Sequence, residues 1–94
     1  MPEILTEDAL SANLRKCPAW ELEGDEITRT LEFETFLEAV EFVNDLAEIA
    51  EESQHHPDID IRYSKVTLRL TTHHKKGLTD LDFEMAQRID NLVD

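Results

Sequence analysis

The chain has 94 residues, and a length of this order suits a single domain, 1–94, with a core modest enough to favour further burial by self-association. Its 22 acidic and nine basic side chains give a net charge of −13, which opposes binding to phosphate backbones and predicts no nucleic-acid partner. Acidic residues also interrupt the first twenty positions, so we expect no signal peptide, no membrane partner and a cytoplasmic location.

The first half of the chain predicts a helix, a hairpin and a second helix. Thr6 is placed to cap a short helix that ends before Pro18. Apolar and polar residues then alternate over 20–33 around a turn at Gly24-Asp25, as in a two-stranded hairpin. Over residues 36–50 the apolar side chains recur at helical spacing, which predicts a central amphipathic helix.

The second half predicts another hairpin and a last helix. The apolar residues that predict two half-buried strands are Ile59, Ile61, Tyr63, Val66, Leu68 and Leu70. The last helix follows Gly77-Leu78, with Thr79 as its N-cap. Its predicted buried stripe consists of Leu78, Leu81, Met85, Ala86, Ile89, Leu92 and Val93. We therefore predict a two-layer α+β domain of order α-β-β-α-β-β-α, with a four-stranded antiparallel sheet covered on one face by helices.

All four histidines fall within residues 55–74, and this clustering is the most informative feature of the sequence. His55-His56 follows the central helix, and His73-His74 follows the last strand. Because imidazole titrates near neutrality, neighbouring histidines can hold different protonation states and act as acid and base. A dehydration needs this pairing, since one group protonates the departing hydroxyl while another takes a proton from the adjacent N–H. Such chemistry needs no metal and no redox cofactor, so we expect none.

Two other interpretations of the histidines stay open at this stage. Four histidines in two loops can be solvated side chains without a task. They can also bind a divalent metal, although adjacent histidines point in divergent directions and the helical i, i+4 pair of metal sites is absent.

Three further residues are candidates for the same site. Asp82 falls inside the predicted buried stripe, where a charge needs a partner, and it also lies three residues after Thr79, where an acid helps to cap a helix. Glu51 lies one turn before His55, near a helix C-terminus that disfavours negative charge. Trp20 is either a flat wall for a ring ligand or a large core residue of the first hairpin.

The spacing of these residues resembles a known family signature. Three residues separate Glu51 from His55-His56-Pro57, five more precede Tyr63, nine more precede His73 and eight more precede Asp82. This pattern resembles that of the pterin-4a-carbinolamine dehydratases. The resemblance extends to residues 20–24, 70–73 and 77–79 and so spans almost the whole chain.

This resemblance implies the same α+β fold, a homodimer or homotetramer, and a hydro-lyase that acts on a small-molecule pterin. The implied reaction converts 4a-hydroxytetrahydropterin to quinonoid dihydropterin and water in tetrahydropterin recycling. The implied catalytic residues are His55, His56 and His73, with His55 and His73 as the proton-transfer pair and His56 as an orienting residue. The implied supporting or substrate-binding residues are Glu51, Asp82, Trp20 and Thr72. The alternative is a non-catalytic pterin-binding or dimerisation scaffold of the transcription-coactivator kind.

Overall fold

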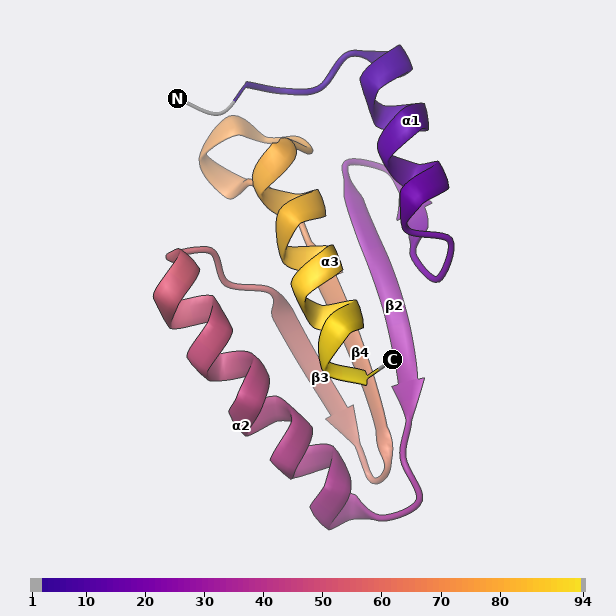
Figure 1. The fold of residues 1–94 in the computed structure, drawn as a ribbon, viewed down its shortest axis with the longest axis vertical. Helices are drawn as coiled ribbons and strands as arrows, with labels where there is room; N and C mark the ends of the chain where they lie inside the picture. The colour runs from indigo at the N-terminus through magenta and orange to yellow at the C-terminus, as the bar shows by residue number, and fades with distance from the viewer. Residues whose placement is uncertain (1–2, 94) are drawn as a thin grey trace.

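The computed structural model describes residues 3–93, and the elements follow one another in the predicted order (Figure 1). They are α1 (Glu7–Lys16), β1 (Glu21–Glu23), β2 (Glu26–Glu32), α2 (Phe36–Ser53), β3 (Asp58–Arg62), β4 (Lys65–Leu70), the 3-10 turn η1 (His73–Lys75) and α3 (Asp80–Val93). Within this part of the chain, no helix has the length and apolar character needed to cross a bilayer.

Side-chain caps and one left-handed residue set the boundaries of the first elements. The hydroxyl of Thr6 accepts a hydrogen bond from the Ala9 N–H at 3.2 Å, which confirms the predicted cap of α1. A full capping box starts α2, because Thr35 and Glu38 each accept a hydrogen bond from the other's backbone N–H. Gly24 turns the first hairpin with a φ of +61°, a conformation that costs glycine little.

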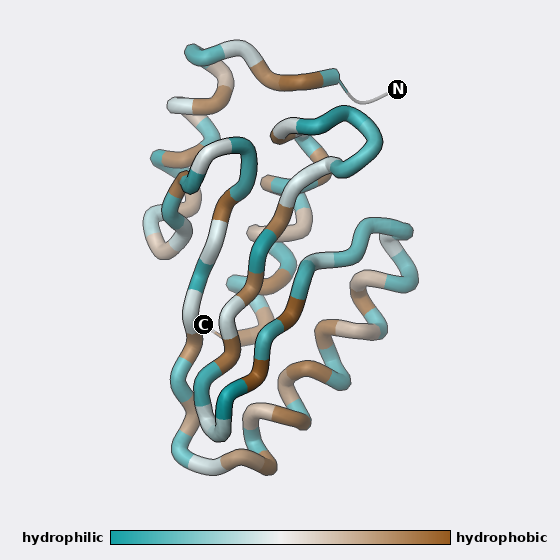
Figure 2. The backbone as a smooth tube through the Cα atoms, turned by 180° about the vertical axis from the view of Figure 1, so that it is seen from behind, coloured by the Kyte–Doolittle hydropathy of each residue, from teal (hydrophilic) through white to brown (hydrophobic). Residues whose placement is uncertain are grey.

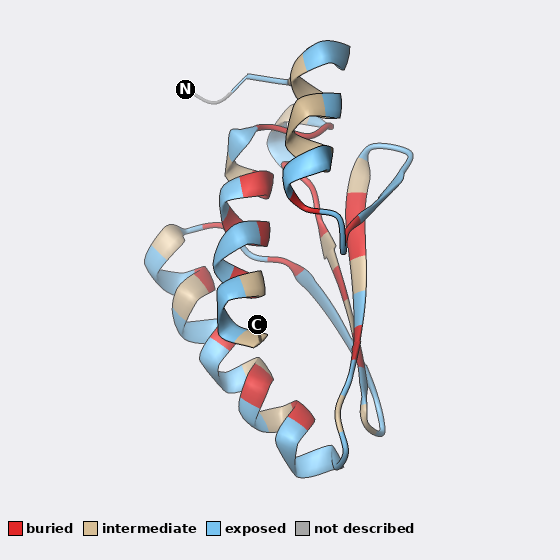
Figure 3. Ribbon diagram, turned by 45° about the vertical axis from the view of Figure 1, so that its right-hand side comes forward, coloured by how far each residue is buried: buried red, intermediate tan, exposed pale blue. Residues whose placement is uncertain are grey.

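The four strands form one antiparallel sheet in the order β1-β2-β4-β3. Ile27 lies opposite Leu70 and Leu31 lies opposite Val66, so apolar side chains of the two central strands share one face. Seen from behind, the sheet lies in front of α3, and hydrophobic and hydrophilic residues alternate along its strands (Figure 2). Seen from the side, the helices lie on one face of the sheet (Figure 3). The predicted two-layer arrangement is confirmed.

The core lies between the central strands and the helices α2 and α3. The buried apolar side chains from these elements are Ile27, Leu31, Ala39, Phe42, Leu46, Ala50, Val66, Leu68, Leu70, Phe83, Met85, Ala86 and Ile89. Burial of this kind stabilises the fold by roughly 1.5–3 kcal/mol for each large side chain. Phe83 is an addition to the predicted stripe of the last helix, and Leu92, which was assigned to that stripe, is exposed.

One prediction about the second hairpin is wrong. β4 alternates between buried residues and residues that are partly buried or exposed, as expected, but every residue of β3 is exposed. Ile59 and Ile61 retain 39% and 37% of their accessible surface, and Tyr63, at 74%, lies in the turn after the strand. The physical reason is position, because β3 is an edge strand with a single neighbour in the sheet and the core forms over the two central strands.

Candidate active site

Two turns bring the histidines to one end of the sheet. α2 ends at Ser53, and Gln54 adopts a left-handed conformation with a φ of +55°, which directs the next residues away from the helix. His55 and His56 therefore lie in the short connection before β3. After β4, Thr72 pairs with Gly77 in an isolated antiparallel bridge, and this bridge closes a short loop that contains η1.

These two connections enclose a pocket of about 220 Å³, which we call the histidine pocket. Its lining residues are Gln54, His55, His56, Thr71, His73, His74 and Leu81. The three histidines that the sequence proposed as catalytic thus share one concavity. The structure adds His74, Gln54, Thr71 and Leu81 to its walls.

A fully buried carboxylate lies behind His55. Asp82 has no accessible surface, and its Oδ1 lies 2.6 Å from His55 Nε2. Its Oδ2 accepts hydrogen bonds from the Thr72 hydroxyl at 2.9 Å and from the Thr79 backbone N–H at 2.9 Å. An isolated buried charge is costly, and these donors supply the compensation it needs. Both predicted roles of Asp82 hold, since the same side chain is a partner of His55 and a cap for the start of α3.

The hydroxyl hydrogens give this network a fixed direction. Each threonine hydroxyl has one hydrogen to donate, and Thr72 donates its hydrogen to Asp82. The Thr79 hydroxyl lies 2.7 Å from the Thr72 hydroxyl, so Thr79 must be the donor in that pair. Thr79 also accepts from the Leu81 N–H at 3.2 Å. The order of donation is therefore Thr79 to Thr72 to Asp82.

This direction assigns the tautomer of neutral His55. Because Asp82 Oδ2 already accepts two hydrogen bonds and the ionised carboxylate can only accept, the hydrogen between Asp82 and His55 belongs to Nε2. In neutral His55 the lone pair is then on Nδ1. Nδ1 has no hydrogen-bond partner within residues 3–93, and no buried side-chain nitrogen or oxygen there lacks a partner. Nδ1 must therefore reach the accessible surface.

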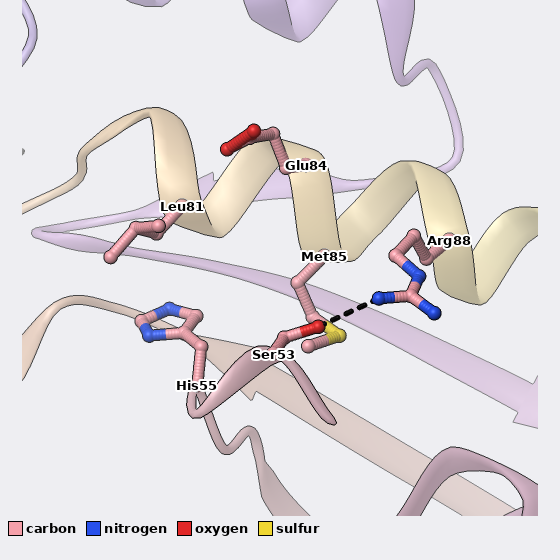
Figure 4. Close-up of a pocket in the computed structure, with 6 residues that line it drawn as sticks. All are labelled: Ser53, His55, Leu81, Glu84, Met85 and Arg88. Atoms are coloured by element: carbon pink, nitrogen blue, oxygen red, sulfur yellow. Dashed lines mark hydrogen bonds between the residues drawn. The ribbon is translucent and has the colours of Figure 1, made fainter. Parts of the chain in front are cut away.

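The view in Figure 4 agrees with this assignment. One ring nitrogen of His55 points toward α3, and the other points away from Ser53 and Arg88. The structure thus presents an imidazole that is held from behind by a carboxylate and has its basic nitrogen at the surface. This arrangement is suited to accepting a proton, because the carboxylate stabilises the imidazolium that forms.

His56 has a carboxylate partner of a different kind. Its Nε2 lies 2.5 Å from Glu51 Oε2, one turn back along α2. The two side chains are 55% and 75% exposed, so water screens the pair and its geometry is weakly held. Glu51 thus contacts the second histidine, and Asp82 contacts the first.

His73 and His74 lie on η1 and are both exposed. Within residues 3–93 neither ring makes a hydrogen bond or an ion pair. Their rings are therefore available to a ligand in the histidine pocket. The same described residues contain no group of three histidine, cysteine, aspartate or glutamate side chains arranged to hold a metal ion.

Trp20 is not brought to this pocket. It is buried in the core, and its indole Nε1 donates to Asp90 Oδ1 at 2.9 Å. Arg29 pairs with the same carboxylate, so the first hairpin is joined to α3 through Asp90. This placement corresponds to the core interpretation of Trp20, which is not among the residues that line the histidine pocket. Thr72 is also buried, and it contacts Asp82 from behind the pocket.

Sequence reasoning missed Thr79 as a member of the site and gave it only a cap. The signal was present, because a buried aspartate three residues after a threonine cap predicts hydrogen bonds in both directions. The position of His74 in the pocket wall could not be predicted from the sequence, because the sequence of an exposed polar turn does not indicate whether a pocket lies beside it.

The fold and the site define a small α+β protein with a histidine-lined pocket in which one imidazole is held by a buried carboxylate. The chain belongs to the pterin 4 alpha carbinolamine dehydratase family, whose model matches residues 3–92.

The chain is 49% identical over 89 residues to a protein of Acidobacterium capsulatum, covering 95% of this chain and 97% of the relative. It is 47% identical over 92 residues to a protein of Picosynechococcus, covering 98% and 100%. Both relatives carry the name "Putative pterin-4-alpha-carbinolamine dehydratase".

Solved structures are also similar to this chain. A transcriptional coactivator/pterin dehydratase from Brucella melitensis superposes with a TM-score of 0.92 and 33% identity, covering 98% of this chain and 100% of that one. A pterin dehydratase-like protein, described as a RuBisCO assembly factor in the alpha-carboxysome, superposes with a TM-score of 0.65 and 22% identity, covering 78% and 84%. The second likeness shows the shared fold alone. Family membership and the names of the relatives support pterin dehydratase activity.

Proposed function

We propose that this protein dehydrates pterin-4a-carbinolamine to quinonoid dihydropterin and water by histidine acid–base catalysis, as a step of tetrahydropterin recycling. The single observation that carries the proposal is the buried His55–Asp82 pair, which opens onto a pocket lined by the other three histidines. The reaction is balanced without a cofactor. One proton goes to the departing hydroxyl, the carbon–oxygen bond breaks, and one proton leaves the adjacent ring nitrogen as the carbon–nitrogen double bond forms.

In this proposal His55 is the base. Its Nδ1 takes the proton from the ring N–H, and Asp82 stabilises the imidazolium through Nε2. His73 is the acid that protonates the hydroxyl, because its ring is exposed in the same pocket and is not held by a carboxylate. His56, paired with Glu51, orients the substrate. Exchange with solvent then restores both proton-transfer groups.

A direct dehydration assay tests the proposal. Carbinolamine is generated enzymatically in a stopped-flow instrument, and its decay is followed with and without the protein. We expect His55→Ala and His73→Ala each to lower turnover by about two orders of magnitude or more, which is the usual contribution of a proton-transfer group. His74→Ala, from the same 3-10 turn, is the matched control and should have a smaller effect.

The outcomes separate the classes of function. Decay no faster than in buffer removes the proposal, and tight pterin binding without acceleration favours the scaffold alternative. A chelator in the assay separates metal-dependent activity from the acid–base mechanism.

Self-association is part of the proposal, and the exposed edge strand β3 provides a surface for it. Antiparallel pairing of two copies about Ile61 sets Asp60 of each copy opposite Arg62 of the other and the two Ile61 side chains opposite each other. The pairing joins opposite charges on one face and apolar side chains on the other. Light scattering should report an oligomer for the wild type, and Ile61→Lys should shift it toward the monomer. A wild type that remains monomeric contradicts this part of the proposal.

A further inference from the structure

Gln54 lines the histidine pocket, and the proposed reaction gives it no task. It directly follows the last residue of α2 and has a φ of +55°, in the left-handed region. This conformation is unfavourable for residues with a Cβ, so glycine or asparagine is the usual residue at such a helix end. A glutamine in this position points to a role for its side chain.

The side-chain amide of Gln54 is held in one orientation. Its Nε2 donates to the Glu51 backbone carbonyl at 2.7 Å. Because a carbonyl only accepts, the amide nitrogen, and not the amide oxygen, must face Glu51. The oxygen Oε1 and the second hydrogen of Nε2 have no partner within residues 3–93. Gln54 is exposed and lines the histidine pocket, so both groups are available to a ligand there.

An amide with a fixed orientation recognises one hydrogen-bonding pattern. Gln54 offers an acceptor, Oε1, and a donor, the second hydrogen of Nε2. The matching ring edge has an N–H next to a carbonyl oxygen, as in a cyclic amide. A ring edge with an acceptor nitrogen next to an amino group has the reverse pattern. The amide matches that edge only by turning over, which places Oε1 against the Glu51 carbonyl.

The covalent structure of a pterin brings a cyclic amide close to Gln54. The carbon that carries the departing hydroxyl is bonded to the nitrogen that loses its proton and also to the carbonyl carbon of the cyclic amide. This N–H and this carbonyl therefore project from the same side of the fused ring. Gln54 and His55 line the same pocket, and one ring nitrogen of His55 points away from Ser53 and Arg88 (Figure 4). A ring with its N–H at His55 Nδ1 thus has its cyclic amide within reach of the adjacent side chain, Gln54.

Resting on the proposed function, we propose that Gln54 is a specificity residue that recognises the cyclic-amide edge of the pterin ring. Nε2 donates its second hydrogen to the ring carbonyl, and Oε1 accepts from the adjacent ring N–H. The hydrogen bond to the Glu51 carbonyl keeps the amide from turning over, so a ring with the reverse pattern is disfavoured. Because the cyclic amide takes no part in the dehydration, recognition by Gln54 and proton transfer by His55 are separable.

The test compares two ligands that differ in this edge. One is 7,8-dihydropterin, and the other is 2,4-diamino-7,8-dihydropteridine, in which an amino group replaces the carbonyl and the adjacent nitrogen accepts. Dissociation constants are measured from ligand fluorescence, at a pH at which both ligands are neutral, with the wild type, Gln54→Gly, Gln54→Met and Tyr63→Gly. Tyr63 is the matched control, because it is also exposed and has a φ of +54°, but it lies in the turn after β3 and does not line the pocket.

We expect the wild type to bind the dihydropterin more tightly than the diamino ligand. Gln54→Gly and Gln54→Met should each reduce the ratio of the two dissociation constants about tenfold, the factor expected for one or two neutral hydrogen bonds. Tyr63→Gly should retain the ratio. In chemical denaturation Gln54→Gly should be at least as stable as the wild type, because glycine suits the left-handed conformation, and its loss of selectivity is then not a loss of fold. If Gln54→Gly is less stable, Gln54→Met decides the ratio.

The outcomes separate this recognition from the proposed function. A wild type that does not distinguish the two ligands, a ratio that a folded Gln54 variant leaves unchanged, or an equal loss in Tyr63→Gly overturns recognition by Gln54. A wild type that accelerates dehydration but binds neither ligand also overturns it, and the proposed function stands. Selective binding that depends on Gln54 without any dehydration supports the recognition and counts against the proposed function.

Discussion

Replacing Asp82 by asparagine changes one atom in the network behind His55. Asp82 Oδ2 accepts from the Thr72 hydroxyl and the Thr79 N–H, so the asparagine oxygen must take that position to avoid placing two donors against its amide nitrogen. The new NH₂ group then faces His55 Nε2. Since an amide nitrogen donates, Nε2 becomes the acceptor and the ring hydrogen moves to Nδ1. The fold is kept, but neutral His55 loses its lone pair at the surface.

The magnitudes follow from the contacts that remain. The asparagine oxygen still accepts from Thr72 and Thr79, but these hydrogen bonds are no longer made to a charged group. We expect this change to lower the free energy of unfolding by about 1–3 kcal/mol. Turnover should fall further, by about 10²–10⁴-fold, because the base no longer has its acceptor in the pocket. Asp82→Ala removes the acceptor from three donors at once and should destabilise the fold more.

Two measurements check this reasoning. Stopped-flow dehydration gives turnover, and ¹⁵N NMR of the imidazole reports whether Nε2 or Nδ1 of His55 carries the hydrogen. Asp90→Asn is the control, because Asp90 is a second carboxylate of α3 that accepts from Trp20 and Arg29, and the histidine pocket does not include it. The reasoning is refuted by Asp82→Asn turnover within about threefold of wild type, by an unchanged tautomer, or by an equal loss in Asp90→Asn.

Three further outcomes are expected. Glu51→Gln should lower turnover by less than about tenfold, because its pair with His56 is exposed and worth about 1 kcal/mol or less; a loss as large as that of Asp82→Asn would contradict this. Thr35→Ala should cost about 0.5–2 kcal/mol by chemical denaturation, because it removes the capping box with Glu38, and an unchanged midpoint would show that the box contributes nothing. Burial raises the pKa of the Cys17 thiol above its usual 9.0, so its contribution to stability is complete below that pH and is lost as the pH rises through the folded pKa. The free energy of unfolding of the wild type should therefore fall more steeply above pH 9.0 than that of Cys17→Ala, and parallel curves would disprove the link.

The sequence predicted those parts of the fold that depend on local pattern. The cap at Thr6, the turn at Gly24 and the helical stripe around Leu46 follow from neighbouring residues, and the structure confirms them. The exposure of Ile59 and Ile61 could not be predicted in this way, because an edge strand and a central strand show the same alternation of apolar and polar residues in the sequence. That difference depends on the order of strands in the sheet.

The site shows the same division. The sequence indicates that Asp82 needs a partner, because it is a charged residue within an apolar helical stripe. The tautomer of His55 depends on hydrogens donated by Thr72 and Thr79, which lie close together only in the folded chain. The wall supplied by His74 and the burial of Trp20 likewise depend on which segments the fold brings into contact.

The carboxylate of Asp82 both caps the first turn of α3 and orients the His55 imidazole, so opening of that turn is coupled to release of the imidazole. A fluctuation that unwinds the first turn of α3 releases the Thr79 N–H from Asp82 and frees His55 to rotate. Hydrogen–deuterium exchange at this one amide therefore reports how often the imidazole is released. Any substitution that speeds exchange at Thr79 should reduce the fraction of molecules ready to react, even where it lies far from the bound ring.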